Sequence, residues 1–368
     1  MHLLKEGEVI RDTYEVERFL GEGAFAEVYR VKHRFLGRQA MKVFKRVGMS
    51  LDEIHEMLGE AILLTHLKHP NIVSVSDANI FQSPKGTCGF FTMEYVPGGS
   101  LDKFWRSHGP QLVPIDTAVD LIKQVSRGIA QAHREKPPII HRDIKPQNIL
   151  VGYEADGLRA RVSDFGLAKK VNPLTLLATA AGTLAFKPPE AFAARKGDSC
   201  AADVWALGVT LYLLLTDQLP FQVDPELGWS NKAAFDKDLD PPSSWNPEID
   251  AGLEKIVLRC MEKNPTKRYP TARELLDALD SWKRPTAPQT PSSKRALSSE
   301  VSKSVLGAHS PADQEEAHRL ARAALKKAKE EGHLFDAADL MEEAFNKSPS
   351  LRTKYADKVR LWRCGISM

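Results

Sequence analysis

The chain has 368 residues, of which 42% are hydrophobic and 27% charged, values that fit a globular protein of roughly two or three domains. Its formal net charge of +3 is too small to favour binding to nucleic acid or to a membrane surface. Four scattered cysteines, Cys88, Cys200, Cys260 and Cys364, form no Cys-x-x-Cys pair, which argues against a zinc site or a disulfide framework.

No targeting or membrane-spanning segment is apparent. The residues after Met1 lack the apolar core of a signal peptide. The longest apolar run, residues 206–215, is shorter than the roughly 20 residues that cross a bilayer. Because unpaired cysteines are typical of a reducing compartment, we expect a cytoplasmic protein.

The first part of the chain favours β-strands. Short apolar runs predict strands at residues 14–17, 27–31, 39–44 and 89–93. Between the third and fourth strands, an apolar stripe with helical spacing predicts a helix over residues 51–67.

Beyond Pro97-Gly98-Gly99 the apolar spacing becomes helical. Helices are predicted at residues 101–106, 115–134, 201–216, 252–263 and 271–282. A small strand-rich part followed by a larger helical part predicts an α+β fold with two lobes and a cleft between them.

We expect one domain over residues 12–284, with lobes at 12–96 and 97–284. Residues 285–311 are rich in Pro, Ser and Thr and poor in large apolar side chains, which predicts a disordered linker. Helical character returns over residues 312–368, so we expect a separate helical tail.

Two features of the strand-rich part suit a nucleotide. Gly21 and Gly23 lie between two predicted strands, which disfavours a dinucleotide fold, whose glycines open a helix. The two glycines would let a hairpin fold closely over phosphates, with backbone N–H groups as donors. The alternative is an ordinary glycine hairpin that binds no phosphate. Lys42 stands in an apolar strand, where a charge is unfavourable unless it is paired; the alternative is a lysine that reaches solvent.

The most informative stretch lies in the helical part. Asp143, Lys145 and Asn148 place a carboxylate, an ammonium and an amide on one short loop, at spacings that phosphoryl transfer can use. Asp164, in Asp164-Phe165-Gly166, adds a second carboxylate. Hard oxygen ligands of this kind suit Mg²⁺.

In this order the motifs resemble the eukaryote-like (Hanks-type) bacterial Ser/Thr protein kinases over about residues 12–284. The resemblance implies the bilobal kinase fold, ATP and Mg²⁺ as cofactors, and proteins as substrates. Gly182-Thr183, leading into Pro188-Pro189-Glu190, separates this family from kinases of small metabolites. Lys145 and Thr183 favour Ser/Thr over Tyr as acceptor. Ala26 replaces the third glycine of the family pattern, and Pro188 replaces an alanine.

The resemblance also implies roles on the catalytic loop. Asp143 is expected to accept the proton of the substrate hydroxyl, and Lys145 to neutralise charge on the transferred phosphate. Asn148 and Asp164 are expected to bind Mg²⁺.

Further roles concern the nucleotide. Lys42 is expected to hold the α- and β-phosphates through an ion pair with Glu60, for which Glu56 is a rival partner. Met93 resembles the gatekeeper, and Glu94, Tyr95 and Val96 the hinge. The nucleotide contacts implied in addition to Lys42 are Leu20, Gly21, Glu22, Gly23, Ala24, Val28, Ala40, Met93, Glu94, Val96 and Leu150. The alternative for the apolar residues of this set is that they only form part of the hydrophobic core.

Three further residues are expected to be structural. Asp203 would brace the backbone of the catalytic loop, and Glu190 would pair with Arg268. For regulation, Arg142 beside the catalytic Asp suggests autophosphorylation of Thr175 or Thr179, the alternative being unmodified surface threonines.

The tail resembles one tetratricopeptide unit over residues 318–351. Because a single unit does not bury its own apolar face, it would pack on the kinase domain or on a protein partner; the alternative is a plain helical hairpin closed by residues 351–362. For the whole chain, the alternative to an active enzyme is a pseudokinase scaffold that binds partners through this tail.

Overall fold

The computed structural model describes residues 2–23, 26–46, 48, 50–84, 86–109, 111–165, 184–194, 199–221, 234–285, 311–330 and 332–366. The chain divides into two compact units. The first comprises Met1–Val96 and Ser163–Ala180, and the second comprises Pro97–Val162 and Ala181–Met368. Nearly all of the predicted linker lies outside the described residues.

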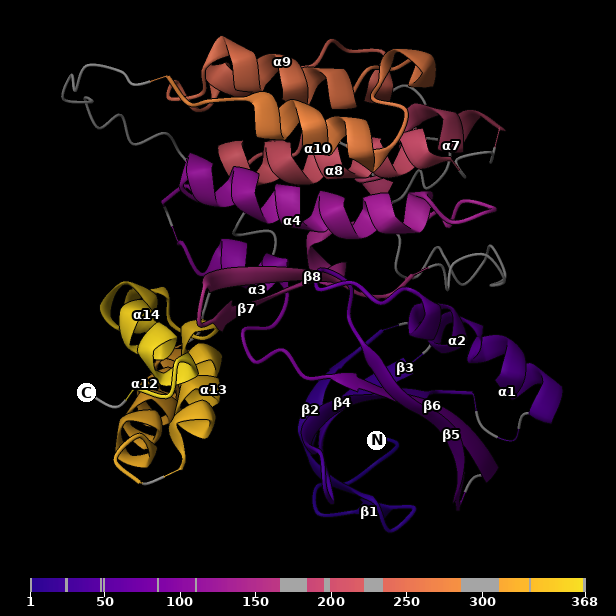
Figure 1. Ribbon diagram of the computed structural model, residues 1–368, viewed down its shortest axis with the longest axis vertical. Helices are drawn as coiled ribbons and strands as arrows, with labels where there is room; N and C mark the ends of the chain where they lie inside the picture. The colour runs from indigo at the N-terminus through magenta and orange to yellow at the C-terminus, as the bar shows by residue number, and fades with distance from the viewer. Residues whose placement is uncertain are drawn as a thin grey trace. The chain divides into compact units, whose positions relative to one another are not determined.

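The first unit is built on a six-stranded antiparallel sheet with the strand order β1-β2-β3-β4-β6-β5 (Figure 1). Buried side chains of its strands, among them Val16, Val31, Met41 and Phe90, form an apolar core. The elements of this unit are β1 (Val9–Ile10), β2 (Tyr14–Glu22), β3 (Ala26–His33), β4 (Gly37–Phe44), α1 (Leu51–Met57), α2 (Gly59–His66), β5 (Val75–Ser83) and β6 (Gly86–Glu94).

The four predicted strands are present as β2, β3, β4 and β6, and β1 and β5 are additional. The helix predicted over residues 51–67 is divided at Leu58 into α1 and α2. Gly59, which follows this break, has a low helix propensity.

The second unit is mainly helical. Its central helix α8 is buried along almost its whole length, which explains the apolar run in the sequence. The elements of its kinase part are α3 (Leu101–Arg106), α4 (Ile115–His133), η1 (Pro146–Asn148), β7 (Ile149–Glu154), β8 (Gly157–Val162), α7 (Pro189–Ala194), α8 (Cys200–Thr216), η5 (Pro242–Ser244), α9 (Ala251–Cys260), η6 (Pro265–Lys267) and α10 (Ala272–Ser281).

Side-chain caps set the starts of several of these helices. Ser199 accepts a hydrogen bond from the backbone N–H of Ala202 at the start of α8. Asp250 does the same for the first turn of α9. Thr271 and Glu274 form a capping box at the start of α10. Such caps satisfy the N–H groups that lack a partner within the helix.

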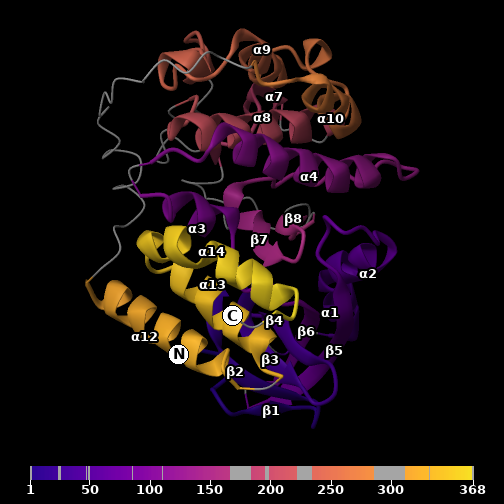
Figure 2. The same cartoon turned by 60° about the vertical axis from the view of Figure 1, so that its left-hand side comes forward.

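Three C-terminal helices, α12 (Pro311–Lys327), α13 (Leu334–Phe345) and α14 (Pro349–Arg363), also belong to the second unit (Figure 2). We call them the C-terminal module. Their shared core is rich in alanine and includes Met341 and Trp362, and Tyr153 of β7 packs against it. Gly332 has a φ of +78° between α12 and α13, a conformation that favours glycine.

The predicted α+β fold with a helical tail is confirmed. Within the described ranges, no helix combines the length and the apolar character that crossing a membrane requires.

Candidate active site

Lys42 lies in the middle of the sheet of the first unit, where β4 places it between Val28 of β3 and Phe91 of β6. Only 8% of its side chain is exposed. The ammonium forms an ion pair with the carboxylate of Asp164 and lies 5.5 Å from the centre of the Phe91 ring. The buried charge is therefore paired, as its position in an apolar strand requires.

Asp164 adopts a left-handed backbone conformation, with a φ of +61°. Phe165, the next residue, is buried. An aspartate tolerates this conformation better than most residues, and here it coincides with the ion pair to Lys42. The side chains of Glu56 and Glu60 lie outside the described residues, as do Ala24 and the segment that contains Thr175, Thr179 and Thr183, so the predictions made for them remain predictions.

The glycine segment lies at the end of β2, whose last residues are Gly21 and Glu22. The backbone N–H of Gly23 donates to the carbonyl oxygen of Ala26 over 2.8 Å. A side chain at Gly21 would meet no atom within 4 Å, so open space lies beside the backbone here. Glu22 pairs with Lys45 over 3.0 Å, and this contact lowers the pKa of Glu22.

The predicted adenine contacts in the first unit fall on neighbouring strands. Ala40 of β4 pairs with Met93 of β6, and both side chains are buried, as is Val96. Leu20 and Val28 are only half-buried. A purely structural role would favour complete burial of these two, so their partial exposure fits residues that line a surface.

The catalytic loop of the second unit is organised around Asp143. The Asn148 side-chain N–H donates to both the carbonyl oxygen and the carboxylate of Asp143, at 2.8 and 2.9 Å. The Lys145 ammonium lies 2.8 Å from the same carboxylate, and the Lys187 ammonium lies 3.9 Å from its other oxygen. These contacts fix one orientation of the carboxylate.

Burial opposes ionisation of Asp143, but the positive charges of Lys145 and Lys187 outweigh it, so the pKa of Asp143 is lowered. The carboxylate is therefore ionised at neutral pH and can accept a proton. Lys187, which also donates to the carbonyl oxygen of Arg142, was not among the predicted site residues. The only signal in the sequence is a single basic residue shortly before Glu190.

The loop backbone is held by Asp203 of α8. Its carboxylate accepts hydrogen bonds from the backbone N–H groups of His141 and Arg142, at 2.8 and 2.9 Å. The ring of His133 lies 3.0 Å from the same carboxylate. Arg142 has a φ of +69°, so the brace stabilises a strained turn. The predicted bracing role of Asp203 fits these contacts.

Glu190 and Arg268 form the expected pair through two parallel hydrogen bonds of 2.7 and 2.8 Å. The Arg268 side chain is fully buried, and its guanidinium also lies 4.8 Å from the centre of the Trp205 ring. A buried cation of this kind needs such partners. The pair therefore anchors the segment after the catalytic loop to the helical core.

A magnesium site cannot be assigned from clustered acids, because the described part of the chain holds no group of three or more His, Cys, Asp or Glu side chains suited to a metal ion. The predicted donors are an amide oxygen of Asn148 and a carboxylate of Asp164. This sparse set of hard oxygen donors fits Mg²⁺, which keeps several waters and takes further oxygens from phosphates.

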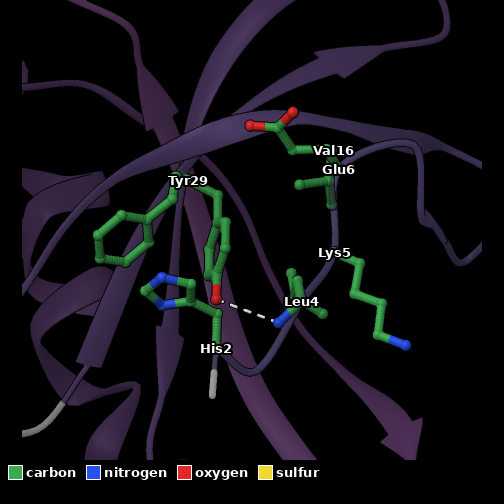
Figure 3. A pocket seen from close by; sticks show the side chains of 7 residues that line it. His2, Leu4, Lys5, Glu6, Val16 and Tyr29 are labelled. Carbon is green, nitrogen blue, oxygen red and sulfur yellow. Dashed lines mark hydrogen bonds between the residues drawn. The ribbon is translucent and has the colours of Figure 1, made fainter.

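A separate cavity of about 390 Å³ lies in the first unit. His2, Leu4 and Tyr29 are among the residues that line it (Figure 3), and the backbone N–H of Leu4 donates to the Tyr29 hydroxyl over 3.1 Å. None of the predicted nucleotide contacts lines this cavity, so it is distinct from the residues assigned to ATP.

Comparison with known proteins shows where this architecture occurs. Residues 14–279 match the family described as protein kinase domain. A probable serine/threonine-protein kinase of Clostridium acetobutylicum is 32% identical over 281 residues, which cover 75% of this chain and 41% of the relative. The serine/threonine-protein kinase PrkC of Bacillus subtilis is 32% identical over 276 residues, which cover 73% of this chain and 40% of the relative.

Solved structures give the same result. A crystal structure of the PknI kinase domain of Mycobacterium tuberculosis, in a mutant form, is similar to this chain with a TM-score of 0.55 and 26% sequence identity. The similarity covers 75% of this chain and 98% of that domain. The chain spans about two fifths of the length of the curated relatives it matches.

Proposed function

Because the chain belongs to the protein kinase family, we propose that it is a Ser/Thr protein kinase that transfers the γ-phosphate of ATP to hydroxyl groups of protein substrates. The names of the two bacterial relatives, both serine/threonine-protein kinases, support this class of acceptor. Lys145 supports it as well, because tyrosine kinases usually lack lysine at this position.

The observation that carries the proposal is the environment of Asp143. A residue that accepts the proton of an attacking hydroxyl must be ionised and correctly oriented. Lys145 and Lys187 favour the ionised form, and Asn148 and the braced backbone orient it. Asp143 accepts the proton as the hydroxyl oxygen attacks the γ-phosphorus. The bond from that phosphorus to the bridging oxygen breaks and ADP leaves, while Lys145 stabilises the negative charge of the transferred group.

The remaining catalytic assignments concern the nucleotide. Lys42, with Glu60 as a second partner, holds the α- and β-phosphates. Asn148 and Asp164 would hold Mg²⁺, which would supply positive charge to offset that of the phosphates. The contacts assigned to the rest of ATP are Leu20, Gly21, Glu22, Gly23, Ala24, Val28, Ala40, Met93, Glu94, Val96 and Leu150.

Two finer assignments rest on the sequence. Autophosphorylation on Thr175 or Thr179 would supply a phosphate with which Arg142 could pair. The tetratricopeptide-like character of residues 318–351 is supported by two consecutive helices, α12 and α13, on either side of Gly332.

An assay with radiolabelled ATP tests the main proposal. Asp143→Asn keeps the shape of the side chain but removes the proton acceptor, so we expect phosphate incorporation into a generic acceptor such as casein to fall by about 100-fold or more. Asp238→Asn, an exposed aspartate of the same unit, is the matched control and should retain activity. Equal and negligible incorporation by wild type and both variants would favour the pseudokinase scaffold.

A further inference from the structure

The C-terminal module shares its core with the kinase part of the second unit. Tyr153, on the β7–β8 hairpin, packs against the apolar core of the module. Its ring meets that of Phe345 of α13 edge to face, with the centroids 6.0 Å apart and an interplanar angle of 74°. Figures 1 and 2 both show α13 and α14 beside β7. The module therefore lies against this hairpin.

A buried cation strengthens this contact. The guanidinium of Arg352, on α14, lies 4.3 Å from the centre of the Phe104 ring of α3. It also lies 5.7 Å from the centre of the Phe345 ring and 6.0 Å from that of Tyr153. Burial lowers the pKa of Arg352, and interactions with Tyr153 and Glu342 act in the opposite direction. The faces of the aromatic rings add a favourable contact with the cation. Arg352 thus connects α14 with α3, α13 and β7.

A buried carboxylate on α13 adds a directional contact. Glu342 accepts a hydrogen bond from the backbone N–H of Tyr153 at 3.1 Å. Its other oxygen lies 2.7 Å from the guanidinium of Arg363. A buried charged group is unfavourable unless its partners are in place. Glu342 therefore ties the backbone of β7 to the module at a fixed position.

The module also contacts the segment Pro97-Gly98-Gly99, which follows the proposed hinge. The Asn346 side-chain N–H donates to the carbonyl oxygen of Pro97 at 3.4 Å. A Cβ atom at Gly98 would lie 2.1 Å from the carbonyl oxygen of Val151 and 2.9 Å from the Glu342 carboxylate. Glycine is therefore required where this segment passes close to both β7 and α13.

These contacts fall on the immediate neighbours of a proposed adenine contact. Leu150 lies on β7, two residues after Asn148, and pairs with Ser100. The backbone N–H of Val151 donates to the carbonyl oxygen of Gly99 over 2.8 Å. The module thus touches both chain segments whose pairing fixes the position of Leu150.

We propose that the C-terminal module is a positioning element for the nucleotide site. By holding β7 and residues 97–99 together, Arg352 and Glu342 fix the position of Leu150 and thereby strengthen the binding of ATP. The inference rests on the proposed kinase function, since it concerns the same nucleotide. Neither Arg352 nor Glu342 contacts the reacting groups in this proposal.

The test uses the full-length chain. Arg352→Glu places a negative charge among the aromatic rings, close to Glu342, and should release the module. Arg360→Glu makes the same charge change at an exposed position of the same helix and is the control. Tyr153→Ala removes the contact from the kinase side and serves as a second variant.

Three measurements are needed. Amide hydrogen exchange over residues 149–154 reports release of the module. Calorimetric titration with ADP and Mg²⁺ gives the Kd, and steady-state assays with casein give KM for ATP and kcat. For Arg352→Glu and Tyr153→Ala we expect faster exchange than in the wild type. The Kd for ADP and the KM for ATP should rise about 5- to 10-fold, while kcat should stay within about 2-fold of the wild-type value. This combination is expected when a change weakens ground-state and transition-state binding equally. The double variant should raise the Kd little beyond either single variant, because both changes break the same contact.

Three outcomes would overturn the inference. Faster exchange with an unchanged Kd would indicate a passive module. A lower Kd or a higher kcat would indicate an inhibitory module. A thermal unfolding scan shows whether each variant is folded, and Asn346→Ala replaces any that is not. If the wild type binds ADP but transfers no phosphate, the proposed function fails, while the Kd comparison still tests the positioning role.

Discussion

Two buried carboxylates of the second unit hold the kinase backbone in similar ways. Asp203 and Glu342 are each only 1% exposed, and each accepts hydrogen bonds from backbone N–H groups. Asp203 lies on the central helix α8 and holds the catalytic loop. Glu342 lies on α13, almost 200 residues after the β7 backbone that it holds.

The two carboxylates differ in how their charge is balanced. Asp203 receives two backbone N–H groups and the ring of His133. Glu342 receives one backbone N–H and depends on Arg363, and burial outweighs these contacts and raises the pKa of Glu342 to about 7. The brace between the module and the kinase part is thus expected to respond to pH near neutrality.

Asp203→Ala should have the largest effect of the changes that test this comparison. It leaves two buried N–H groups without their charged acceptor, so we expect the free energy of unfolding to fall by about 3–5 kcal/mol. Phosphate transfer should fall as well, because the catalytic loop loses its brace. Denaturant titration and the casein assay measure both. Asp277→Ala, at an exposed ion pair, should change stability by less than about 1 kcal/mol; equal effects would contradict the comparison.

A pH titration addresses the second carboxylate. Because the pKa of Glu342 is raised, the folded chain retains this proton up to about pH 7, whereas an unfolded chain releases it near the ordinary value of 4.5. The stabilisation from this group is therefore complete below about pH 4.5 and is lost as the pH rises through 7. Arg363, Asp339 and Arg352 are charged groups that face it.

Glu342→Gln should remove this dependence. Between pH 5 and 7 the unfolding free energy of the wild type should fall relative to that of the variant, by at most about 1.4 kcal/mol per pH unit. Denaturant titrations at several pH values measure the difference. Parallel curves for the two proteins would show that Glu342 is ionised throughout this range.

Lys187→Met should have the smallest effect. It removes one of the two ammonium groups that lower the pKa of Asp143, so that pKa should rise and the acid limb of the pH–rate profile should move to higher pH. At pH 8 the rate should change by less than about 3-fold, since Asp143 remains ionised there. Lys255→Met, an exposed lysine of α9, is the control. A profile identical to that of the control would remove Lys187 from the site.

The sequence was sufficient where local pattern determines structure. The apolar stripes of α4, α8, α9 and α10 placed these helices to within one or two residues at most boundaries. Strands β1, β5, β7 and β8 were not predicted. In β5, polar residues such as Asp77 and Asn79 interrupt any apolar run. Its pairing with β6 fixes it instead, which is a tertiary effect that no local pattern reveals.

For the site, motif order predicted that Asp143 and Asn148 share one loop and that Asp203 braces it, and the hydrogen bonds agree. Their catalytic and metal-binding roles stay predictions. The pairing of Lys42 with Asp164 and the approach of Lys187 to Asp143 were not predicted. Both contacts join segments distant in sequence, and long side chains of this kind choose their partners only after the chain has folded. The contact of Glu342 with β7 is a further example.

The shared core of the C-terminal module and Tyr153 has a practical consequence for recombinant work. A fragment shortened to end near residue 284, as the motif boundaries suggest, would expose the Tyr153 and Phe104 rings that the module covers. Exposed aromatic surface of this kind promotes self-association. Preparations that retain the chain to residue 366 should accordingly remain monodisperse at higher concentration than the shortened fragment.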